Sequence, residues 1–364
     1  MKLSEIIKEL HRLAPLASQE SYDNSGLIIG KPDREVKKAL ISLDCTEKVV
    51  AEAKRRKCDL IISHHPIIFK GIKKLTGETH VERTIMKAIQ HDISIFAMHT
   101  NLDNSLEGVN RKIGEKIGIK NPKILLPKAG DLVKVSVFCP PGKTDALATA
   151  MFDAGAGNIG NYAQCSFSTN GMGTFFGNKM TKPVVGKKNR REKIPEIKLE
   201  VVTNCYLLNG VLQAMKNAHP YEEVAFDCYN LLNTDHSTGS GMIGELPKSV
   251  DFKVFMRKLK SSFKCGIIRF AGPKKSSLQR IAWCGGSGSF LIEAAIANKA
   301  DIFITGDVKY HDFFRAEDKI IVADIGHYES EQFTIQLLGE LLQKKFPTFA
   351  ACFTETNTNP VQYF

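Results

Sequence analysis

Two adjacent histidines, His64 and His65, follow the apolar run 60–62 closely and are closed off by Pro66. Neighbouring residues at the end of a strand point in different directions, so this pair can serve two metal ions or line two sides of one cleft. Imidazole nitrogen is a common ligand of divalent transition metals. The pair therefore predicts metal ligation, and the alternative is two polar residues in an ordinary turn.

His99 and Asp103 stand in a second segment of this kind, directly after the apolar run 93–98. Asp103 can supply a carboxylate oxygen to a divalent ion, and His99 can act as a ligand, an orienting group or a proton shuttle. Considered alone, Asp103 could equally be the N-cap of a helix that begins at residues 105–107.

His327 and Glu331 belong to a third segment, which follows the apolar run 319–323. If a helix begins near His327, the two residues are one turn apart and share one face. A histidine and a carboxylate in the first turn of a helix can clamp a metal together, as the H-E-x-x-H helix does. The alternative is a solvated, charged first turn that the helix dipole stabilises.

The candidate metal ligands are three imidazoles and two carboxylates, all at the ends of expected strands: His64, His65, Asp103, His327 and Glu331. This set is too small to saturate two divalent ions, so positions stay open for water or substrate, and one carboxylate can bridge. A hydrolytic site with two ions ~3.5–4 Å apart needs such positions. The mixed nitrogen and oxygen set suits Zn, Fe, Mn or Ni without choosing among them.

Three other segments are weaker candidates. The glycine-rich residues 285–288 could bind a phosphate through backbone N–H groups or form a tight structural turn. Residues 305–307, together with His311, could face the same cleft or cap the following helix. His219 in the segment 218–223 is better explained as part of a turn that stabilises its domain.

The elements that must position these residues alternate between strand and helix periodicity. This alternation predicts an α/β fold with a mainly parallel sheet. In the first part of the chain we expect strands at 26–29, 39–43, 60–62 and 93–98, with helices at 46–57, 80–90 and about 105–117. The same alternation of strands and helices returns after residue 240. We expect strands there at 281–284, 301–305 and 319–323, and helices at 289–298 and about 328–345. The tail from Thr354 to Phe364 is expected to be loosely ordered.

Residues 131–237 have a different pattern, with two strand–helix–strand units joined by a hairpin around residues 171–173. This order is typical of a ferredoxin-like α+β domain. We therefore expect an inserted domain at 131–237 between an N-terminal lobe, 1–130, and a C-terminal lobe, 238–364.

Length and composition fit this organisation. A chain of 364 residues predicts about two or three domains, and 43% hydrophobic with 24% charged residues is typical of a globular protein. No run approaches ~18 apolar residues, and the N-terminus lacks the apolar core of a signal peptide, so we expect a cytoplasmic location without membrane contact. The nine cysteines include no C-x-x-C pair, which favours reduced thiols over disulfides or a zinc ribbon.

The net charge is +11, from 50 basic and 39 acidic residues, and almost all of it lies outside residues 131–237, which carry 11 basic and 10 acidic residues. With one Trp and no interleaving of aromatic and basic residues, a nucleic-acid partner is disfavoured. The excess instead favours an anionic small-molecule substrate.

Five segments, in this order, resemble motifs of the Nif-three-like family, whose members are catalogued as GTP cyclohydrolase 1 type 2 homologues. They are Tyr22-Asp23-Asn24-Ser25-Gly26-Leu27, Ile62-Ser63-His64-His65-Pro66, His99-Thr100-Asn101-Leu102-Asp103, Thr305-Gly306-Asp307 and Gly326-His327-Tyr328-Glu329-Ser330-Glu331. The middle segment is similar to the PII-like (CutA-like) insert of the longer members, through residues 157–162 and 219–223.

The resemblance implies a two-lobed α/β fold with a dinuclear metal site in the cleft, held by the same five ligands. It also implies a homo-hexameric ring with the metal sites facing an internal cavity that the insert caps. Two positions depart from the family pattern: Tyr22 stands where many members carry Trp, and Tyr310-His311 where some carry two histidines. The second departure leaves the role of His311 open.

The resulting expectation is a metal-dependent hydrolase of a nucleotide or a phosphorylated small molecule, with GTP ring opening as the named candidate. His99 would be the acid/base group, and Lys70, Lys73 and Lys74 could bind a triphosphate. The alternatives are a non-catalytic metal-binding regulatory or adaptor protein and, third, a ring that binds nucleic acid.

Overall fold

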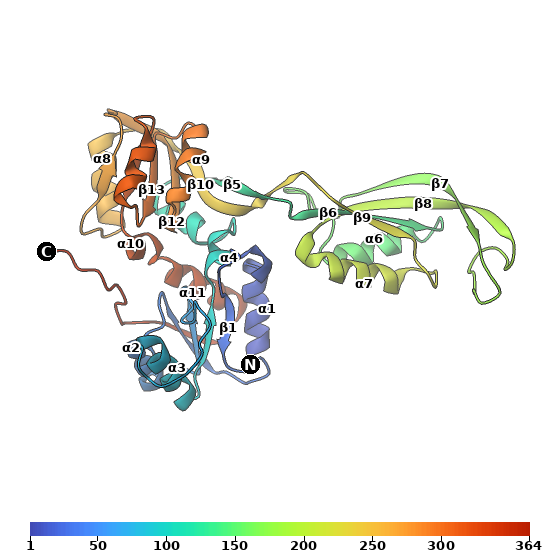
Figure 1. The fold of residues 1–364 in the computed structure, drawn as a ribbon, viewed down its shortest axis with the longest axis horizontal. Helices are drawn as coiled ribbons and strands as arrows, with labels where there is room; N and C mark the ends of the chain where they lie inside the picture. Colours follow the sequence, from blue (N-terminus) through green and yellow to red (C-terminus); the bar gives the residue numbers. More distant parts are fainter. The chain divides into compact units, whose positions relative to one another are not determined.

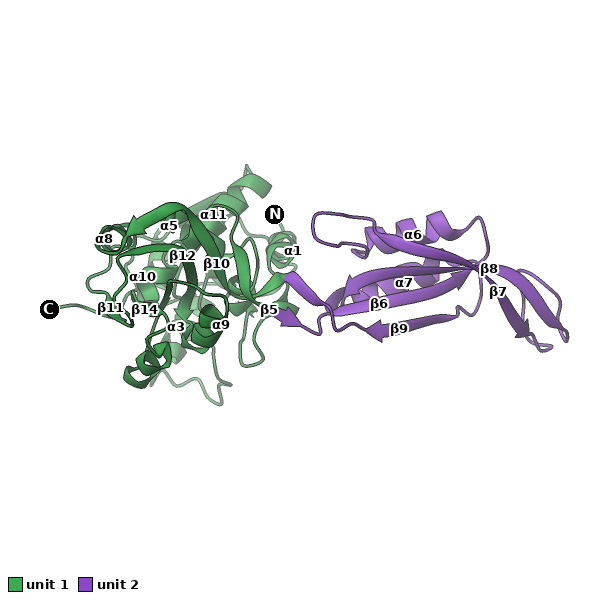
Figure 2. Ribbon diagram, turned by 90° about the horizontal axis from the view of Figure 1, so that it is seen from above, with its two compact units in different colours: residues 1–126, 237–364 green, residues 127–236 purple.

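The computed structural model describes residues 1–364, and the chain divides into two compact units. The first unit comprises residues 1–126 and 237–364, and the second comprises residues 127–236 (Figure 2). Two strands carry the chain across the boundary, β5 (Lys123–Ala129) and β10 (Thr234–Asp251). No helix is both long enough and apolar enough to cross a membrane.

The N-terminal lobe of the first unit is built on a five-stranded sheet with the order β1-β4-β3-β2-β15. Only β1 runs antiparallel to its neighbour. Most residues of these apolar strands are buried, as expected for a parallel sheet covered on both faces. The strands are β1 (Gly26–Ile29), β2 (Lys38–Ser42), β3 (Leu60–Ser63), β4 (Ser94–Ala97) and β15 (Ala350–Phe353).

Helices α1 (Leu3–Leu13), α2 (Glu47–Arg55) and α3 (His80–Gln90) belong to this lobe (Figure 1). The helix α1 buries Leu3, Ile6 and Leu10 at helical spacing. Threonine side chains accept hydrogen bonds from the first-turn N–H groups of α2 and α3, which fixes where these helices begin.

The C-terminal lobe contains a six-stranded mixed sheet with the order β11-β14-β13-β12-β10-β5. Its three central strands are parallel, while β11 and β10 run antiparallel to their neighbours β14 and β12. The strands are β11 (Arg269–Ala271), β12 (Ser277–Ser287), β13 (Ile302–Gly306) and β14 (Ile321–Asp324), together with β10 and β5. The helices are α8 (Phe252–Ser262) and α9 (Ile292–Ala297), with 3-10 turns at Ser289–Leu291 and Tyr310–Ala316.

The two lobes of the first unit exchange elements and share one hydrophobic core. The strand β15 comes late in the chain yet pairs with β2 of the N-terminal sheet. Conversely, α5 (Val109–Ile117) packs on β12, where the Trp283 indole N–H donates a 2.7 Å hydrogen bond to the carbonyl of Asn110. A side chain at Gly114 would come within 2.6 Å of the Trp283 ring, so this close packing needs glycine. Buried contacts within this shared core therefore hold the two lobes together.

The long helix expected at about 328–345 is wrong, because the chain forms two helices there, α10 (His327–Glu331) and α11 (Thr334–Lys345). The helix α10 packs against β12, β13 and α5, whereas α11 packs against α5, β2 and β15. The two helices thus share α5 as a neighbour but pack on the sheets of different lobes. The helix expected at 105–117 is also shorter, beginning at Val109 after a single turn, α4 (Thr100–Asp103).

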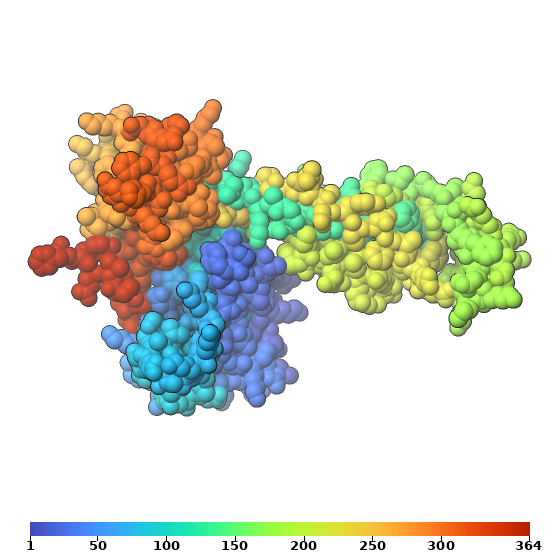
Figure 3. Space-filling model, viewed as in Figure 1, coloured from blue at the N-terminus to red at the C-terminus, as the bar shows by residue number.

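The C-terminal tail, expected to be loosely ordered, carries no regular structure but is attached to the first unit by hydrogen bonds. Residues after Phe353 are held by side chains of the first unit, with the Glu52 carboxylate accepting hydrogen bonds from Thr354 and Thr356, and Asp44 accepting one from Thr358. In Figure 3 the red end of the chain starts between the orange C-terminal lobe and the blue N-terminal lobe, and its tip projects beyond them on the left.

The second unit is a four-stranded antiparallel sheet with the order β7-β8-β6-β9. Its elements follow the chain as β6 (Leu132–Cys139), α6 (Thr144–Asp153), β7 (Ser166–Phe176), β8 (Arg191–Asn204), α7 (Leu208–Ala218) and β9 (Phe226–Asn230). The helices α6 and α7 pack on the sheet around a separate core. The expected hairpin is present as the antiparallel pair β7 and β8, and residues 171–173 lie within its first strand, because the turn comes later, at 177–190. Gly173 makes room within β7 for the Glu196 carboxylate, which a Cβ would approach to 1.9 Å.

Candidate metal centre

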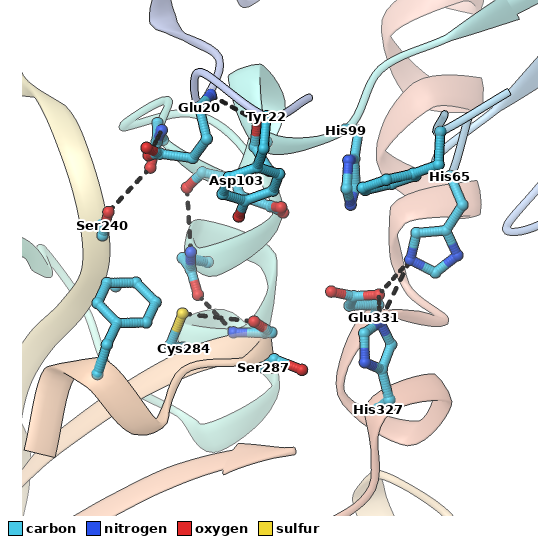
Figure 4. Close-up of a pocket in the computed structure, with 17 residues that line it drawn as sticks. Glu20, Tyr22, His65, His99, Asp103, Ser240, Cys284, Ser287, His327 and Glu331 are labelled. Atoms are coloured by element: carbon cyan, nitrogen blue, oxygen red, sulfur yellow. Dashed lines mark hydrogen bonds and ion pairs between the residues drawn. The ribbon is translucent and has the colours of Figure 1, made fainter. Parts of the chain in front are cut away.

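The five candidate ligands and His99 converge within the first unit, where strand ends of both lobes meet. Figure 4 shows all of them except His64. His64 and His65 follow β3, His99 follows β4, and α10 carries His327 and Glu331 directly after β14. Most of these side chains line a cavity of 460 Å³. The rule that sheets present their functional residues at the carboxyl ends of their strands therefore holds for both sheets.

His64 is fully buried and holds one ring nitrogen ready for a ligand. Its Nδ1–H donates a 2.7 Å hydrogen bond to the carbonyl of Met98, so the lone pair is on Nε2. That Nε2 lies 3.6 Å from Asp103 Oδ1 and 3.8 Å from Glu331 Oε2. Neither His64 Nε2 nor Asp103 Oδ1 has a hydrogen-bond partner. Two unpartnered polar atoms this deeply buried are costly, and a cation between them would satisfy both.

Glu331 Oε2 lies at the middle of the cluster. It is 3.0 Å from His65 Nε2 and 3.1 Å from His327 Nε2, and these two nitrogens are 3.3 Å apart. Burial alone would lower the pKa of both histidines, but the hydrogen bonds to carboxylates outweigh it. They raise the pKa of His65 to about 10 and that of His327 to about 11. The carboxylates around these two imidazoles therefore favour the protonated form of each ring.

The pKa values of the two buried carboxylates, Asp103 and Glu331, are shifted in opposite directions. Burial, reinforced by the charge of Glu331, raises the pKa of Asp103. Burial would raise the pKa of Glu331 too, but the surrounding histidines lower it. The charge of Glu331 thus opposes ionisation of Asp103. A divalent ion would remove the repulsion and allow both carboxylates to ionise.

Four imidazoles of the cluster share one arrangement: Nδ1 is hydrogen-bonded to a residue around the cluster, and Nε2 does not take part in that bond. Besides His64, the Nδ1 atoms of His65, His99 and His327 each lie 2.7 Å from a carboxylate oxygen. The carboxylates belong to Asp44, Asp23 and Asp307, respectively. Such outer carboxylates orient metal-binding imidazoles and raise their basicity.

These three aspartates are the site residues that sequence reasoning missed. Asp23 and Asp307 stood inside motifs that carried the family resemblance, but without a role, and Asp44 was not singled out. The available signal was position, since Asp44 and Asp307 follow directly after β2 and β13, the neighbours of the strands that carry ligands.

Three groups of side chains could each hold a cation, with ligand atoms within 4.8 Å of one another. They are His65 with His327 and Glu331, His64 with Asp103 and Glu331, and His64 with His65 and His99. Glu331 belongs to the first two groups, which together contain all five ligands predicted from the sequence. His99 appears only in the third, beside the two adjacent histidines.

The glycines at 285–288 make room for the cluster and cannot bind a phosphate. A Cβ at Gly286, whose φ is +61°, would lie 2.3 Å from Glu331 Oε1. The N–H groups of Gly285, Gly286 and Gly288 already donate to side chains, those of Asn110, Ser330 and Thr305, respectively. The segment is also no tight turn, because β12 continues through Ser287.

Aromatic rings form part of the cavity wall on two sides. Tyr22 and Phe69 stack with ring centroids 6.4 Å apart, and the Phe69 ring meets the His99 ring edge-on at 5.5 Å. Phe290 lines the same cavity from the C-terminal lobe. All three rings are largely exposed, which leaves apolar surface open to a bound molecule.

Other residues singled out from the sequence lie elsewhere. Lys70, Lys73 and Lys74 are exposed and are not among the residues that line the cavity. His311 is exposed, packs against Tyr310, and does not face the cluster. In the second unit, both ring nitrogens of His219 are bonded to the backbone, which agrees with a stabilising turn.

Fold and site together define a two-lobed α/β protein with a buried histidine–carboxylate cluster at the junction of its lobes. Residues 1–360 match the family model described as Duf34/NIF3 (NGG1p interacting factor 3). The chain belongs to this family. Its relatives include proteins named "GTP cyclohydrolase 1 type 2 homolog". The one from Halalkalibacterium halodurans is 36% identical over 93% of this chain and 91% of the relative, and the one from Bacillus subtilis is 34% identical over 99% and 98%.

Solved structures agree with this assignment. A Bacillus cereus protein related to NIF3 is similar with a TM-score of 0.85 and 33% identity, covering 100% of this chain and 99% of the other. The Staphylococcus aureus protein SA1388 is similar with a TM-score of 0.79 and 31% identity over the same shares. The similarity thus extends along the whole length of the chain.

Proposed function

We propose that this protein is a dinuclear metal-dependent hydrolase of a nucleotide or a phosphorylated small molecule. The single observation that carries the proposal is the surroundings of Glu331, whose Oε2 is within 4 Å of the Nε2 atoms of His64, His65 and His327. An unpartnered Asp103 oxygen lies beside them. Buried imidazoles and carboxylates cost free energy unless they are paired or bind a cation, and His64 Nε2 and Asp103 Oδ1 have no partner within the protein.

Two groups of ligands would hold the two ions. His64 and Asp103 would bind one, His65 and His327 the other, and Glu331 would be shared. Zn, Fe, Mn and Ni all suit a set of imidazoles and carboxylates. When bound, such a pair of ions lowers the pKa of a coordinated water and so supplies a nucleophile for hydrolysis.

His99 is the proposed acid/base group. Its Nδ1 is bonded to Asp23, which leaves Nε2 free to hold or release a proton, and its ring lines the cavity. It is hydrogen-bonded in the same way as the ligand histidines, so its outer partner fixes the tautomer. The family label makes the ring opening of GTP the first reaction to test.

The cavity supports a substrate with a planar ring. Tyr22, Phe69 and Phe290 offer aromatic faces, and the basic excess of the chain favours an anion. We propose an anionic small molecule as the partner of this site, with neither nucleic acid nor membrane as a ligand.

We further propose that residues 131–237 form a ferredoxin-like, PII-like insert between the lobes 1–130 and 238–364. The order of two strand–helix–strand halves in one antiparallel sheet supports this proposal. A homo-hexamer with a cytoplasmic location remains part of it, and rests on the resemblance described above.

The experiment is metal analysis of the purified protein, followed by a screen of nucleotides and phosphoesters with each divalent ion. We expect metal-dependent turnover that Asp103→Ala abolishes without unfolding the chain. The matched control is Asp33→Ala, at an exposed position outside the cavity. Bound metal without any turnover would instead favour the non-catalytic regulatory protein, and unchanged turnover in Asp103→Ala would refute the proposed site.

A further inference from the structure

The last residues of the chain run across the back of the candidate metal centre. We use the name C-terminal strap for residues 354–363, which follow β15 and carry no regular structure. Figure 1 shows this segment leaving the N-terminal lobe beside the α2 end and passing towards α10. It lines a second cavity, of 550 Å³, whose wall includes His65 and His327. The two histidines thus separate this cavity from the one that holds Tyr22 and Phe69.

The strap is anchored first on α2. The buried carboxylate of Glu52 accepts hydrogen bonds of 2.7 Å from the hydroxyls of both Thr354 and Thr356. It also accepts bonds from the backbone N–H groups of Glu355 and Thr356. These bonds fix the start of the strap independently of the metal centre.

The next contact reaches the cluster. The Thr358 hydroxyl donates a 2.5 Å hydrogen bond to Asp44 Oδ2, while the other oxygen, Oδ1, lies 2.7 Å from His65 Nδ1. Thr358 and His65 therefore bind opposite oxygens of one carboxylate. Since a carboxylate rotates freely about its last bond, a second fixed partner restricts the plane in which it receives the imidazole.

The strap then contacts the other lobe. Asn359 Nδ2 and Tyr363 Oη each lie 3.4 Å from Oε1 of Glu329, a buried residue of α10. Glu329 stands between His327 and Glu331 on that helix. The strap thus contacts both lobes. In the N-terminal lobe it bonds Asp44, the partner of His65, and in the C-terminal lobe it contacts α10, which carries His327 and Glu331.

We propose that Thr358 is a positioning residue for the metal centre, which acts through Asp44 to fix the orientation of His65. This inference rests on the proposed function insofar as it takes His65 to be a metal ligand. Removing an outer partner of a metal-binding histidine lowers metal affinity by about 10–100-fold. Thr358 is one hydrogen bond further from the metal ligand than Asp44 is, so we expect its effect on metal affinity at the lower end of that range.

The test uses the full-length protein and Co²⁺, whose visible absorption reports ligand geometry. Thr358→Val removes the hydroxyl while it keeps the shape of the side chain, and Thr358→Ser restores the hydroxyl. We expect Thr358→Val to bind Co²⁺ about tenfold more weakly in a chelator competition and to shift the absorption spectrum. Thr358→Ser should bind within about twofold of the unmodified chain, with its spectrum.

The matched control is Thr356→Val, which loses the same kind of hydrogen bond from the same strap, but to Glu52 rather than to Asp44. We expect its Co²⁺ affinity and spectrum to be unchanged. If Thr356→Val weakens binding as much as Thr358→Val, or if Thr358→Val binds Co²⁺ like the unmodified chain, Thr358 has no positioning role. Failure of the unmodified chain to bind any divalent ion would overturn the proposed function itself and this inference with it.

Discussion

His65 and His327 come from opposite lobes of the first unit, yet their Nε2 atoms lie 3.3 Å apart and both face Glu331. The Nδ1 atom of each imidazole is bonded to an aspartate of its own lobe, His65 to Asp44 and His327 to Asp307. The cluster therefore exists only where the lobes meet. Their shared core, with Trp283 packed on α5, keeps the two halves in place.

Replacing Glu331 by Gln should remove the shared acceptor of the cluster. We expect metal content to fall by at least half in metal analysis, because both groups of ligands that use Glu331 lose a charged oxygen. The control is Glu340→Gln, on the half-exposed surface of α11, which should retain the metal content of the unmodified chain. Full metal content in Glu331→Gln would contradict the assignment.

Replacing Gly286 by Ala tests whether this glycine is there to make room for Glu331. The added methyl would lie 2.3 Å from Glu331 Oε1, at a φ of +61° that disfavours side chains. We expect reduced metal binding and a loss of about 1–3 kcal/mol in the free energy of unfolding, measured by urea denaturation. Gly210→Ala in α7 meets no neighbouring atom and should cause no loss. Equal effects of the two variants would show that the crowding at Gly286 is unimportant.

Replacing Tyr22 by Ala should weaken substrate binding without changing the chemical step. Tyr22 stacks on Phe69 at the cavity wall but is not among the metal ligands. We expect KM to rise by about 2–10-fold with kcat nearly constant, in proportion to the loss of one aromatic contact. Tyr310→Ala, on an exposed ring outside this cavity, serves as the control. A fall in kcat alone would place Tyr22 in the chemistry instead.

The link between the strap and α2 should depend on pH. Burial would raise the pKa of Glu52, but hydrogen bonds from Thr356, Glu355, Thr354 and Arg56 lower it to about 2. Because the folded pKa is below the unfolded value of 4.5, this carboxylate stabilises the fold above that pH, and the contribution disappears as pH falls towards 2.

Glu52→Gln should therefore lower the free energy of unfolding at neutral pH by about 1–3 kcal/mol, as for other hydrogen bonds to a charged group. The difference from the unmodified chain should shrink under acid conditions, as measured by urea denaturation over a pH series. Glu355→Gln, at a mostly exposed side chain, should cost much less. A difference independent of pH would mean that the charge of Glu52 is not what holds the strap.

The candidate ligands could be predicted because they depend on local sequence. His64, His65 and Asp103 lie at or just beyond the ends of short apolar strands, and the spacing of His327 and Glu331 places them on one helix face. The main strands could be predicted for the same reason, since each is an apolar run bounded by polar residues. Both inferences need only a few neighbouring residues.

The outer aspartates could not be predicted in this way. Asp23 and His99 are 76 residues apart, and Asp44 and His65 are 21 apart, so nothing in the local pattern pairs them. The break after Glu331 also accompanies packing against distant elements, since α10 packs on β12 and α11 on β2 and β15. The order of the tail also depends on partners far away in the chain, Glu52 and Asp44.

The strand β15 has a consequence for how the protein folds. It is the edge partner of β2, and the strap that follows it completes the surroundings of Asp44. Because Ala350 pairs with Lys38, the first sheet is completed by a contact between residues far apart in the sequence, and contacts of this kind form slowly. His65 therefore reaches its final environment only when the C-terminal lobe and the first sheet have come together.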